Sequence, residues 1–154
     1  MTTERTEVSA RPVGRIAAWI ARQVERGLAT NSELTLPQYR VLGLLAESNE
    51  LPSSLADKLN VRRPSITAVV DGLVARGLVT RTPAEDDRRQ VSHAITAEGR
   101  RVLAVADADV DQRLTDISGC LDSEDEAAAA IAGIELWGKA LANWGSRQTA
   151  GAGR

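Results

Sequence analysis

The chain has 154 residues and a net charge of −2, and 43% of the residues are hydrophobic, which supports one domain with a modest core and excludes a disordered chain. No stretch approaches the roughly 20 apolar residues of a membrane span, and the first residues lack the apolar segment of a secretion signal. The sequence therefore predicts a cytoplasmic protein that does not enter a membrane.

Residues 1–11 are polar, and we expect a flexible tail there. A helix is predicted over residues 12–28, where Ile16, Ile20 and Val24 recur every four residues and so share one helical face. A loop over residues 29–33 should separate this helix from the next one.

Thr35 begins the next predicted helix. Thr35 and Gln38 have the spacing of a capping box, in which the threonine side chain accepts a backbone hydrogen bond and the glutamine side chain reaches back. The helix should continue to about Glu47. Its side chains expected in the core are Tyr39, Leu42 and Leu45.

Two short helices are predicted between Pro52 and Gly77. Pro64 suits the first turn of the second helix, where its missing N–H costs nothing, and Gly77 suits a helix stop. The second helix has an apolar stripe opposite a polar face, and the two helices with their tight link match a helix-turn-helix. The stripe consists of Ile66, Val69, Val70, Leu73 and Val74.

A hairpin should follow the two helices. Residues 78–82 and 91–95 can form its strands, and the loop over residues 84–90 is rich in charged side chains. A charged hairpin behind a helix-turn-helix is typical of a wing. The second strand should end at Thr96, where a new helix begins.

Two long helices are predicted over residues 97–144, the second opened by a capping box at Ser123 and Glu126. The last helix carries an apolar seam at alternating spacings of three and four residues, as in a coiled coil. This seam exceeds what a small winged helix needs, and therefore implies a protein partner. Its residues are Ile134, Trp137, Leu141 and Trp144. Residues 145–154 are rich in Gly, Ala and Ser, and a flexible tail is expected there.

The basic residues are unevenly distributed. Residues 58–89 contain seven basic and four acidic side chains, so this segment is positive although the whole chain is negative. A local basic face on an acidic body suits contact with nucleic-acid phosphates.

The run from Leu55 to Thr96 resembles the winged helix of the MarR family of bacterial transcription regulators. Asp87, Arg88 and Arg89, followed by a strand that closes in Ile95 and Thr96, match the wing motif of that family, and residues 34–45 also match. The resemblance covers most of residues 12–145. It implies a mainly α fold in which a winged helix-turn-helix, about residues 35–96, carries N- and C-terminal dimerisation helices, about residues 12–28 and 97–144, in one domain over residues 12–144.

The exposed face of the second short helix is predicted to bind DNA, since serine, threonine and arginine contact base edges and phosphates. Its residues are Arg62, Arg63, Pro64, Ser65, Thr67 and Ala68. Arg62 stands where a capping Ser or Thr is usual and cannot cap, which favours a phosphate contact. The resemblance adds Arg88 and Arg89 of the wing, with Arg89 in the minor groove and braced by Asp87.

The resemblance further implies a homodimer on a pseudo-palindromic operator, and a small aromatic or phenolic effector that lowers DNA affinity. The expected dimer residues are Ile16, Ile20, Ile134, Trp137, Leu141 and Trp144. The candidate effector-binding residues, where the dimerisation helices meet the winged helix, are Trp19, Arg22, Tyr39 and Arg40. The alternative is a winged helix that binds another protein and no DNA.

The remaining reactive side chains do not predict an enzyme. No nucleophile and base pair, phosphate loop or metal-binding cluster is present, so we expect no catalytic residues, no cofactor and no metal. His93, placed by strand alternation on the inner face with Val91 and Ile95, favours a buried, hydrogen-bonded histidine over a pH- or ligand-sensing one. Cys120 favours a plain buried thiol, and the acidic residues 107–116 favour a solvated helix face.

Overall fold

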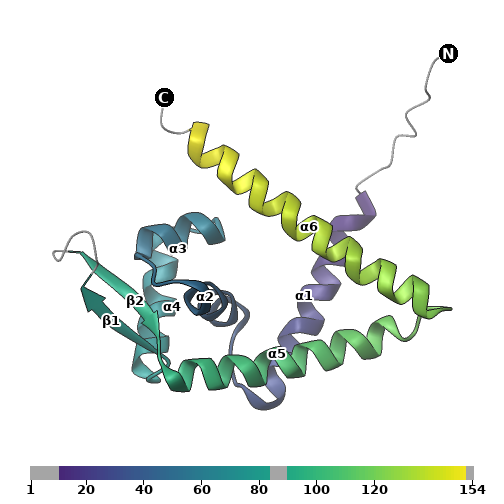
Figure 1. The fold of residues 1–154 in the computed structure, drawn as a ribbon, viewed down its shortest axis with the longest axis horizontal. Helices are drawn as coiled ribbons and strands as arrows, with labels where there is room; N and C mark the ends of the chain where they lie inside the picture. The colour runs from purple at the N-terminus through teal and green to yellow at the C-terminus, as the bar shows by residue number, and fades with distance from the viewer. Residues whose placement is uncertain (1–10, 84–89, 152–154) are drawn as a thin grey trace.

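The computed structural model describes residues 11–83 and 90–151 (Figure 1). The order of the elements is α1 (Arg11–Asn31), α2 (Leu36–Glu47), α3 (Pro52–Leu59), α4 (Arg63–Ala75), β1 (Val79–Pro83), β2 (Val91–Ile95), α5 (Ala97–Ser118) and α6 (Glu124–Gly151). This order confirms the predicted mainly α fold, in which long helices flank a winged helix-turn-helix.

The hydrophobic core lies between α2, α3, α4 and β1, and the facing ends of α1 and α5 close it. Leu28 of α1 and Leu42 of α2 are fully buried, and Val102 marks the contribution of α5. Tyr39, which was expected in the core, is only partly buried against it, because its hydroxyl donates a hydrogen bond to Asp107 of α5. The core thus holds the winged helix together with the C-terminal end of α1 and the N-terminal end of α5.

The capping signals are confirmed where they were predicted. The Thr35 side chain accepts a hydrogen bond from the Gln38 N–H, and the Gln38 side chain accepts one from the Thr35 N–H. At the C-terminal end of α4, Gly77 has a φ of +71°, a left-handed conformation that glycine adopts without a steric penalty. The Leu78 N–H then bonds to the Leu73 carbonyl, which ends the helix and moves the first strand one residue beyond its predicted start.

Helix α5 is joined tightly to the end of α4. The Thr96 hydroxyl accepts a hydrogen bond from the Gly99 N–H at 3.0 Å and donates one to the Gly77 carbonyl at 2.7 Å. A Cβ atom on Gly99 would lie 2.1 Å from the Leu78 carbonyl oxygen, so this position requires glycine. The joint ties the start of the long helix to the end of α4.

Two helices are longer than expected. α1 continues to Asn31 rather than residue 28, and its end is closed by the Ser32 hydroxyl, which donates to the Leu28 carbonyl at 2.7 Å. α6 continues to Gly151, so the tail predicted over residues 145–154 is helical for most of its length. One glycine inside a helix costs only about 1 kcal/mol, and Gly145 therefore does not end α6. The tail predicted over residues 1–11 lies almost wholly outside the described residues.

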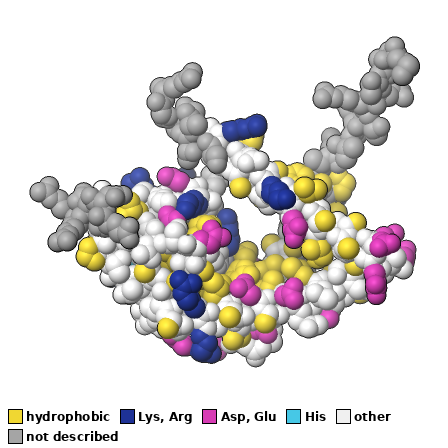
Figure 2. Space-filling view, viewed as in Figure 1, with side chains coloured by type: hydrophobic (Ala, Val, Ile, Leu, Met, Phe, Trp, Pro, Cys, Tyr) yellow, Lys and Arg dark blue, Asp and Glu magenta, His cyan; other side chains and the backbone are white. Residues whose placement is uncertain are grey.

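α6 has a different environment from the other helices. α5 runs away from the winged helix, and α6 turns back at its far end and crosses α1 (Figure 1). Figure 2 shows hydrophobic side chains gathered in the hollow that α1, α5 and α6 border, and acidic ones at the α5–α6 corner. The large apolar side chains of α6 remain exposed in the single chain, as expected of a helix that packs against another molecule.

Two expectations for α5 are corrected. Cys120, predicted as a buried thiol, is exposed in the turn after α5, where its thiol donates a hydrogen bond to the Asp116 carbonyl. The acidic face of α5 is not merely solvated, because Asp107 accepts a hydrogen bond from Tyr39 and Asp109 accepts one from Asn31. Within the described ranges, none of the helices combines the length and apolar character that a membrane span requires.

Candidate nucleic-acid interface

The turn between α3 and α4 is short and well defined. Asn60 caps α3 with a φ of +52°, a left-handed conformation that asparagine tolerates better than most residues. Its N–H bonds to the carbonyls of Ala56 and Asp57, and the Val61 N–H also bonds to Ala56. This turn sets the direction in which α4 leaves α3, and therefore how α4 is presented to a partner.

α4 buries one face and exposes the other. Ile66, Val70 and Leu73 are in the core, whereas the opposite face is accessible to solvent. All six helix residues predicted to bind DNA are exposed, namely Arg62, Arg63, Pro64, Ser65, Thr67 and Ala68. Arg62 stands at the N-cap position and makes no side-chain cap, as expected.

The positive charges of this region are not equivalent. Arg62 and Arg63 form no ion pair with a described residue, and they stand at the N-terminal end of α4, where the helix dipole adds further positive potential. Arg76 instead donates to the carbonyls of Ser32 and Glu33 at 3.2 and 3.1 Å, at the far end of α4. The charge available to a phosphate is therefore concentrated at the start of α4.

Lys58 bonds to an acidic side chain of the protein itself, although the sequence analysis grouped it with the basic face. Its ammonium group bonds to the carboxylate of Glu50, whose side chain is only 8% exposed. Burial alone would raise the pKa of Glu50, but hydrogen bonds from Lys58, Ser54 and Ser48 hold that pKa below its usual range. The backbone of Glu50 also pairs with His93, so this cluster fastens α3 to β2.

An ion pair that the sequence did not indicate joins α4 to the hairpin. Arg81 of β1 lies 2.5 Å from the carboxylate of Asp71, and both side chains are about half exposed. Asp71 is an acid on the recognition face, where an unpaired carboxylate would repel phosphate. Arg81 neutralises the Asp71 carboxylate. The charge of Arg81 is therefore used within the protein and does not add to the positive charge available to DNA.

The hydroxyl of Thr67 already has a partner. It donates a hydrogen bond to the Arg63 carbonyl one turn earlier at 3.1 Å, a common arrangement for threonine in helices. Its methyl group and acceptor lone pairs remain available on the exposed face. Ser65 is also exposed, and its hydroxyl can turn outward.

The tip of the wing lies outside the described residues, and with it Asp87, Arg88 and Arg89. The strands that carry the tip are paired in register from Val79 opposite Ile95 to Pro83 opposite Val91. The hydroxyls of Thr82 and Ser92 lie 2.9 Å apart and close this ladder near its outer end. The hairpin prediction is confirmed, while the wing contacts stay a prediction.

His93 departs in part from its expected setting. The ring is buried, with 5% of the residue exposed, but its Nδ1 atom has no hydrogen-bond partner, so the expected hydrogen-bonded histidine is wrong at that atom. Simple alternation also fails along β2: Val91 is exposed while Ser92 is buried, because the hairpin extends past the core at that end. Burial, and then the charge of Arg81, lower the pKa of His93.

The predicted dimer residues are accessible in the single chain. Ile134, Trp137, Leu141 and Trp144 of α6 are between 51% and 64% exposed, and Ile16 of α1 is 52% exposed. Ile20 is half-buried. Such a set of large apolar side chains on the exposed faces of two helices is typical of a surface that another molecule covers.

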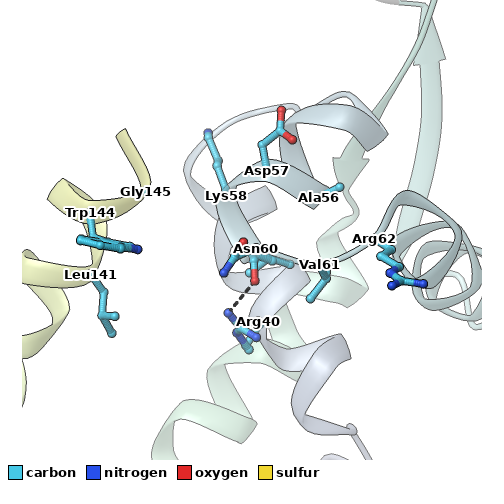
Figure 3. Close-up of a pocket in the computed structure, with 11 residues that line it drawn as sticks. Arg40, Ala56, Asp57, Lys58, Asn60, Val61, Arg62, Leu141, Trp144 and Gly145 are labelled. Atoms are coloured by element: carbon cyan, nitrogen blue, oxygen red, sulfur yellow. Dashed lines mark hydrogen bonds between the residues drawn. The ribbon is translucent and has the colours of Figure 1, made fainter. Parts of the chain in front are cut away.

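The four candidate effector-binding residues stand on two helices, Trp19 and Arg22 on α1 and Tyr39 and Arg40 on α2. Trp19 is 75% exposed, and Arg22 on the same helix pairs with Glu25. The Tyr39 hydroxyl donates to the Asp107 carboxylate at 2.6 Å, and burial together with this bond raises the pKa of Tyr39. Arg40 alone of the four lines the cavity shown in Figure 3, between α6 and the α3–α4 turn.

Comparison with known sequences points to one family. Residues 34–91 match the profile of the MarR family. The HTH-type transcriptional regulator FarR of Neisseria gonorrhoeae is 32% identical over 100 residues, which are 64% of this chain and 68% of FarR. The homoprotocatechuate degradative operon repressor of Escherichia coli is 27% identical over 100 residues, with the same shares of the two chains.

Solved structures share the fold. The transcriptional repressor CouR of Rhodococcus jostii, bound to a 23-mer DNA duplex, is 27% identical with a TM-score of 0.71, over 90% of this chain and 97% of CouR. Apo MarR of E. coli superposes with a TM-score of 0.73 at 22% identity, over 82% of this chain and 94% of MarR, a likeness of fold alone.

Proposed function

Because this chain belongs to the MarR family of transcription regulators, we propose that it is a cytoplasmic repressor that binds a pseudo-palindromic operator as a homodimer. The observation that carries this proposal is the exposed N-terminal end of α4, where Arg62 and Arg63 have no ion pair with a described residue. A solvated helix face would not need two guanidinium groups beside the positive end of a helix dipole. A phosphate backbone would satisfy both.

The proposed contacts divide into two kinds. Arg62 and Arg63 hold the phosphates on either side of the major groove, and Ser65, Thr67 and Ala68 face the base edges. Arg88 and Arg89 of the wing reach the adjacent minor groove, with Asp87 orienting Arg89. The likeness to CouR supports this arrangement, since that protein has the same fold and was solved with DNA.

The homodimer follows from the apolar surface of α1 and α6. Two copies that cover each other's exposed seams would present two α4 helices to one face of the duplex, related by a two-fold axis. The boundaries proposed from the sequence, with dimerisation helices on either side of a winged helix, agree with this division. We further propose that an effector lowers DNA affinity, which accords with the description of the E. coli relative as a repressor of a degradative operon.

Binding of duplex DNA tests the proposal against the alternative of a protein-binding module. Duplexes selected by the protein from a random pool would be titrated by fluorescence anisotropy at increasing salt. The logarithm of the affinity should fall linearly with the logarithm of the salt concentration, with a slope of roughly −0.9 for each phosphate contact. A pool from which no sequence is enriched, with a flat salt response, would favour the protein-binding alternative.

Charge-removing variants assign the contacts. Arg63→Gln should reduce the salt slope by about two for a dimer, because each subunit loses one phosphate contact. Arg89→Ala should weaken most selected duplexes by roughly tenfold without changing the preferred bases in the major groove. Arg101→Gln removes a charge on α5 that is already paired with Glu98, and serves as the matched control. Normal binding by folded Arg89→Ala would remove the wing from the interface.

A further inference from the structure

His93 stands in the middle of a row of residues that crosses the hairpin. Its N–H donates to the Glu50 carbonyl at 2.8 Å, and its carbonyl accepts from the Glu50 N–H at 3.1 Å. On its other side it lies directly opposite Arg81 of β1. Because Glu50 uses both backbone groups of His93, the pair with Arg81 has no backbone hydrogen bonds, and in such pairs the facing side chains approach most closely. The His93 ring therefore stands between an anionic and a cationic residue.

The row continues to a helix at each end. Lys58 of α3 bonds to the Glu50 carboxylate, and Arg81 lies 2.5 Å from the carboxylate of Asp71 on α4. His93 is neutral at pH 7, because burial and then the charge of Arg81 lower its pKa. We call these five residues the charge row, namely Lys58, Glu50, His93, Arg81 and Asp71. It connects both helices of the helix-turn-helix to the hairpin.

A proton on His93 would disturb the contact of α4 with the hairpin. The residue is 5% exposed, and its Nδ1 atom is buried without a partner. Protonation turns both ring nitrogens into donors, and a buried donor needs an acceptor. The charge of Asp71 favours the protonated ring, whereas the charge of Arg81 opposes it. Because these two side chains already pair with each other, a charged ring competes with Arg81 for Asp71.

The other ionisable groups near β2 have partners or face solvent. The Glu50 carboxylate already accepts hydrogen bonds from Ser48, Ser54 and Lys58. Helix α2 packs against β2 as well. Of its ionisable side chains, two bond elsewhere and one is exposed, namely Tyr39 to Asp107, Arg40 to the Leu59 carbonyl, and Glu47. Asp71 is therefore the acceptor that a protonated ring would recruit.

We infer that His93 is the proton-sensitive centre of the charge row, and that protonation of its ring weakens DNA binding by loosening the contact of α4 with the hairpin. The inference rests on the proposed function, in which α4 and the wing enter adjacent grooves and must keep a fixed spacing. It departs from the structural role that the sequence favoured for this histidine. Asp71 drawn toward the ring leaves Arg81, and the hairpin is then no longer tied to α4. Binding to DNA restores the tie and releases one proton from each subunit.

The phosphates of DNA act in the opposite direction. A negative potential favours the charged form of a histidine, so acid would tighten the binding of DNA to a simple basic surface. Salt screens that attraction over about 8 Å at physiological ionic strength. The ion pair of Arg81 with Asp71 is instead a direct contact. The direction of the pH effect therefore distinguishes the charge row from general attraction to phosphate.

DNA affinity measured against pH tests the inference. At physiological salt, the Kd of the unaltered protein for a selected duplex should rise at least roughly fivefold between about pH 7.5 and 5, because two rings per dimer take up protons. His93→Gln keeps a polar side chain that cannot be protonated, and should show no such rise. Arg101→Gln breaks the ion pair with Glu98 on α5 and should keep the full response.

Three results of that measurement would overturn the inference. The first is a Kd that falls or stays constant in acid. The second is a rise that persists in His93→Gln. The third is a rise that occurs only at pH values where the circular dichroism spectrum shows unfolding, since affinity is then lost with the whole fold.

The ring itself can be titrated by NMR without DNA. The chain has one histidine, so its imidazole signal needs no assignment. Arg81→Gln should raise the pKa of the ring, because a like charge is removed, and Asp71→Asn should lower it. Arg101→Gln should leave it unchanged. In the unaltered protein, binding of a duplex should lower the pKa of the ring, since linkage between proton and DNA is reciprocal. A ring that responds to neither Arg81 nor Asp71 would contradict the charge row.

These titrations separate the inference from the proposed function. If the ring responds as expected but duplexes bind equally well at every pH, the acid response is wrong and the DNA-binding proposal stands. If no duplex binds at any pH, the DNA-binding proposal is wrong and the acid response fails with it. The titrations of the free protein would still decide whether the charge row couples His93 to α4.

Discussion

Helices α4 and α6 both carry an apolar stripe, yet the chain satisfies one and leaves the other exposed. In α4, Ile66, Val70 and Leu73 are at most 2% exposed, because α2, α3 and β1 surround them. In α6, Trp137 and Leu141 are 51% and 64% exposed, since α6 packs only lightly against α5 and α3. A stripe therefore predicts that a helix face will be covered, without saying whether the same chain covers it.

The difference assigns separate tasks to the two helices. α4 is fixed by its own core, so its polar face can be held rigidly toward DNA. A long helix such as α6 that buries so little would be marginal in water on its own, because most helical stability in proteins comes from packing. The stability and direction of α6 must then depend on a second molecule. In a dimer, the direction of α6 in turn sets the spacing between the two α4 helices.

Placing a charge in the apolar seam of α6 should disrupt the dimer, and this is the largest effect that we expect. Trp137→Lys buries an ammonium group in the proposed interface and should raise the dimer dissociation constant by at least roughly 100-fold, the usual cost of losing an aromatic anchor. Light scattering should then give a mass near 16.4 kDa instead of about twice that value. DNA affinity should fall with it, because one α4 helix replaces two.

Ala132→Lys is the matched control for that variant. Ala132 is exposed and lies on the side of α6 away from Trp137, at 100° of rotation per residue. The added charge is the same, but dimerisation should be retained. A Trp137→Lys protein that remains dimeric and binds DNA normally would show that the seam is not where the subunits meet.

Local signals carried most of the correct sequence predictions. The capping box at Thr35, the stop at Gly77 and the start of α5 after Thr96 each depend on residues a few positions apart. Nothing distant in the chain can override such short-range hydrogen bonds and φ preferences easily. The apolar stripe of α4 was equally readable, because its period is the period of the helix itself.

The predictions that failed depended on packing between distant segments. Val91 was placed inside by alternation, but the hairpin leaves the core there. Cys120 was placed inside by its apolar character, yet it falls in a turn between two helices. Trp19 and Arg40, grouped as one expected effector site, stand on different helices, α1 and α2, and that site stays a prediction. Sequence spacing does not contain these long-range positions.

The described part of the winged helix contains a buried polar atom without a partner, and removing that atom should sharpen the contrast with α6. The Nδ1 atom of His93 is buried without a partner, and such a group costs about 1–3 kcal/mol. His93→Leu keeps the volume and the backbone pairing with Glu50, so the free energy of unfolding should rise by about 1 kcal/mol at pH 7. Chemical denaturation would measure this change, with His93→Gln as a polar control that should not stabilise.

The same variant should change the response to acid. Burial and the charge of Arg81 lower the pKa of His93 in the folded protein, while the unfolded chain keeps a value near 6.5. Above about pH 6.5 the ring is neutral in both states. As the pH falls toward the folded pKa, the unfolded chain gains a proton first, and stability is lost. His93→Leu should therefore lose less stability between about pH 6.5 and 5, and an unchanged slope would contradict this origin.

The smallest expected effect concerns a single methyl group on the face that α4 presents. A threonine whose hydroxyl donates to its own helix cannot donate to a phosphate oxygen or to guanine, and Thr67 donates to the Arg63 carbonyl. What it offers outward is its methyl group, which suits the C5-methyl group of thymine. We therefore expect Thr67 to distinguish thymine from other bases by contact rather than by hydrogen bonding.

Replacing that thymine with deoxyuridine removes one methyl group from the DNA and isolates the contact. The unaltered protein should lose about 0.8 kcal/mol of binding free energy, close to a fourfold change in Kd. Thr67→Val keeps the methyl group and loses the hydroxyl, so it should bind thymine duplexes normally and show the same loss with deoxyuridine. Thr67→Ser keeps the hydroxyl and loses the methyl group, so it should no longer distinguish the two duplexes. The opposite pattern, in which Thr67→Ser binds normally and Thr67→Val does not, would show that the hydroxyl leaves Arg63 to contact DNA.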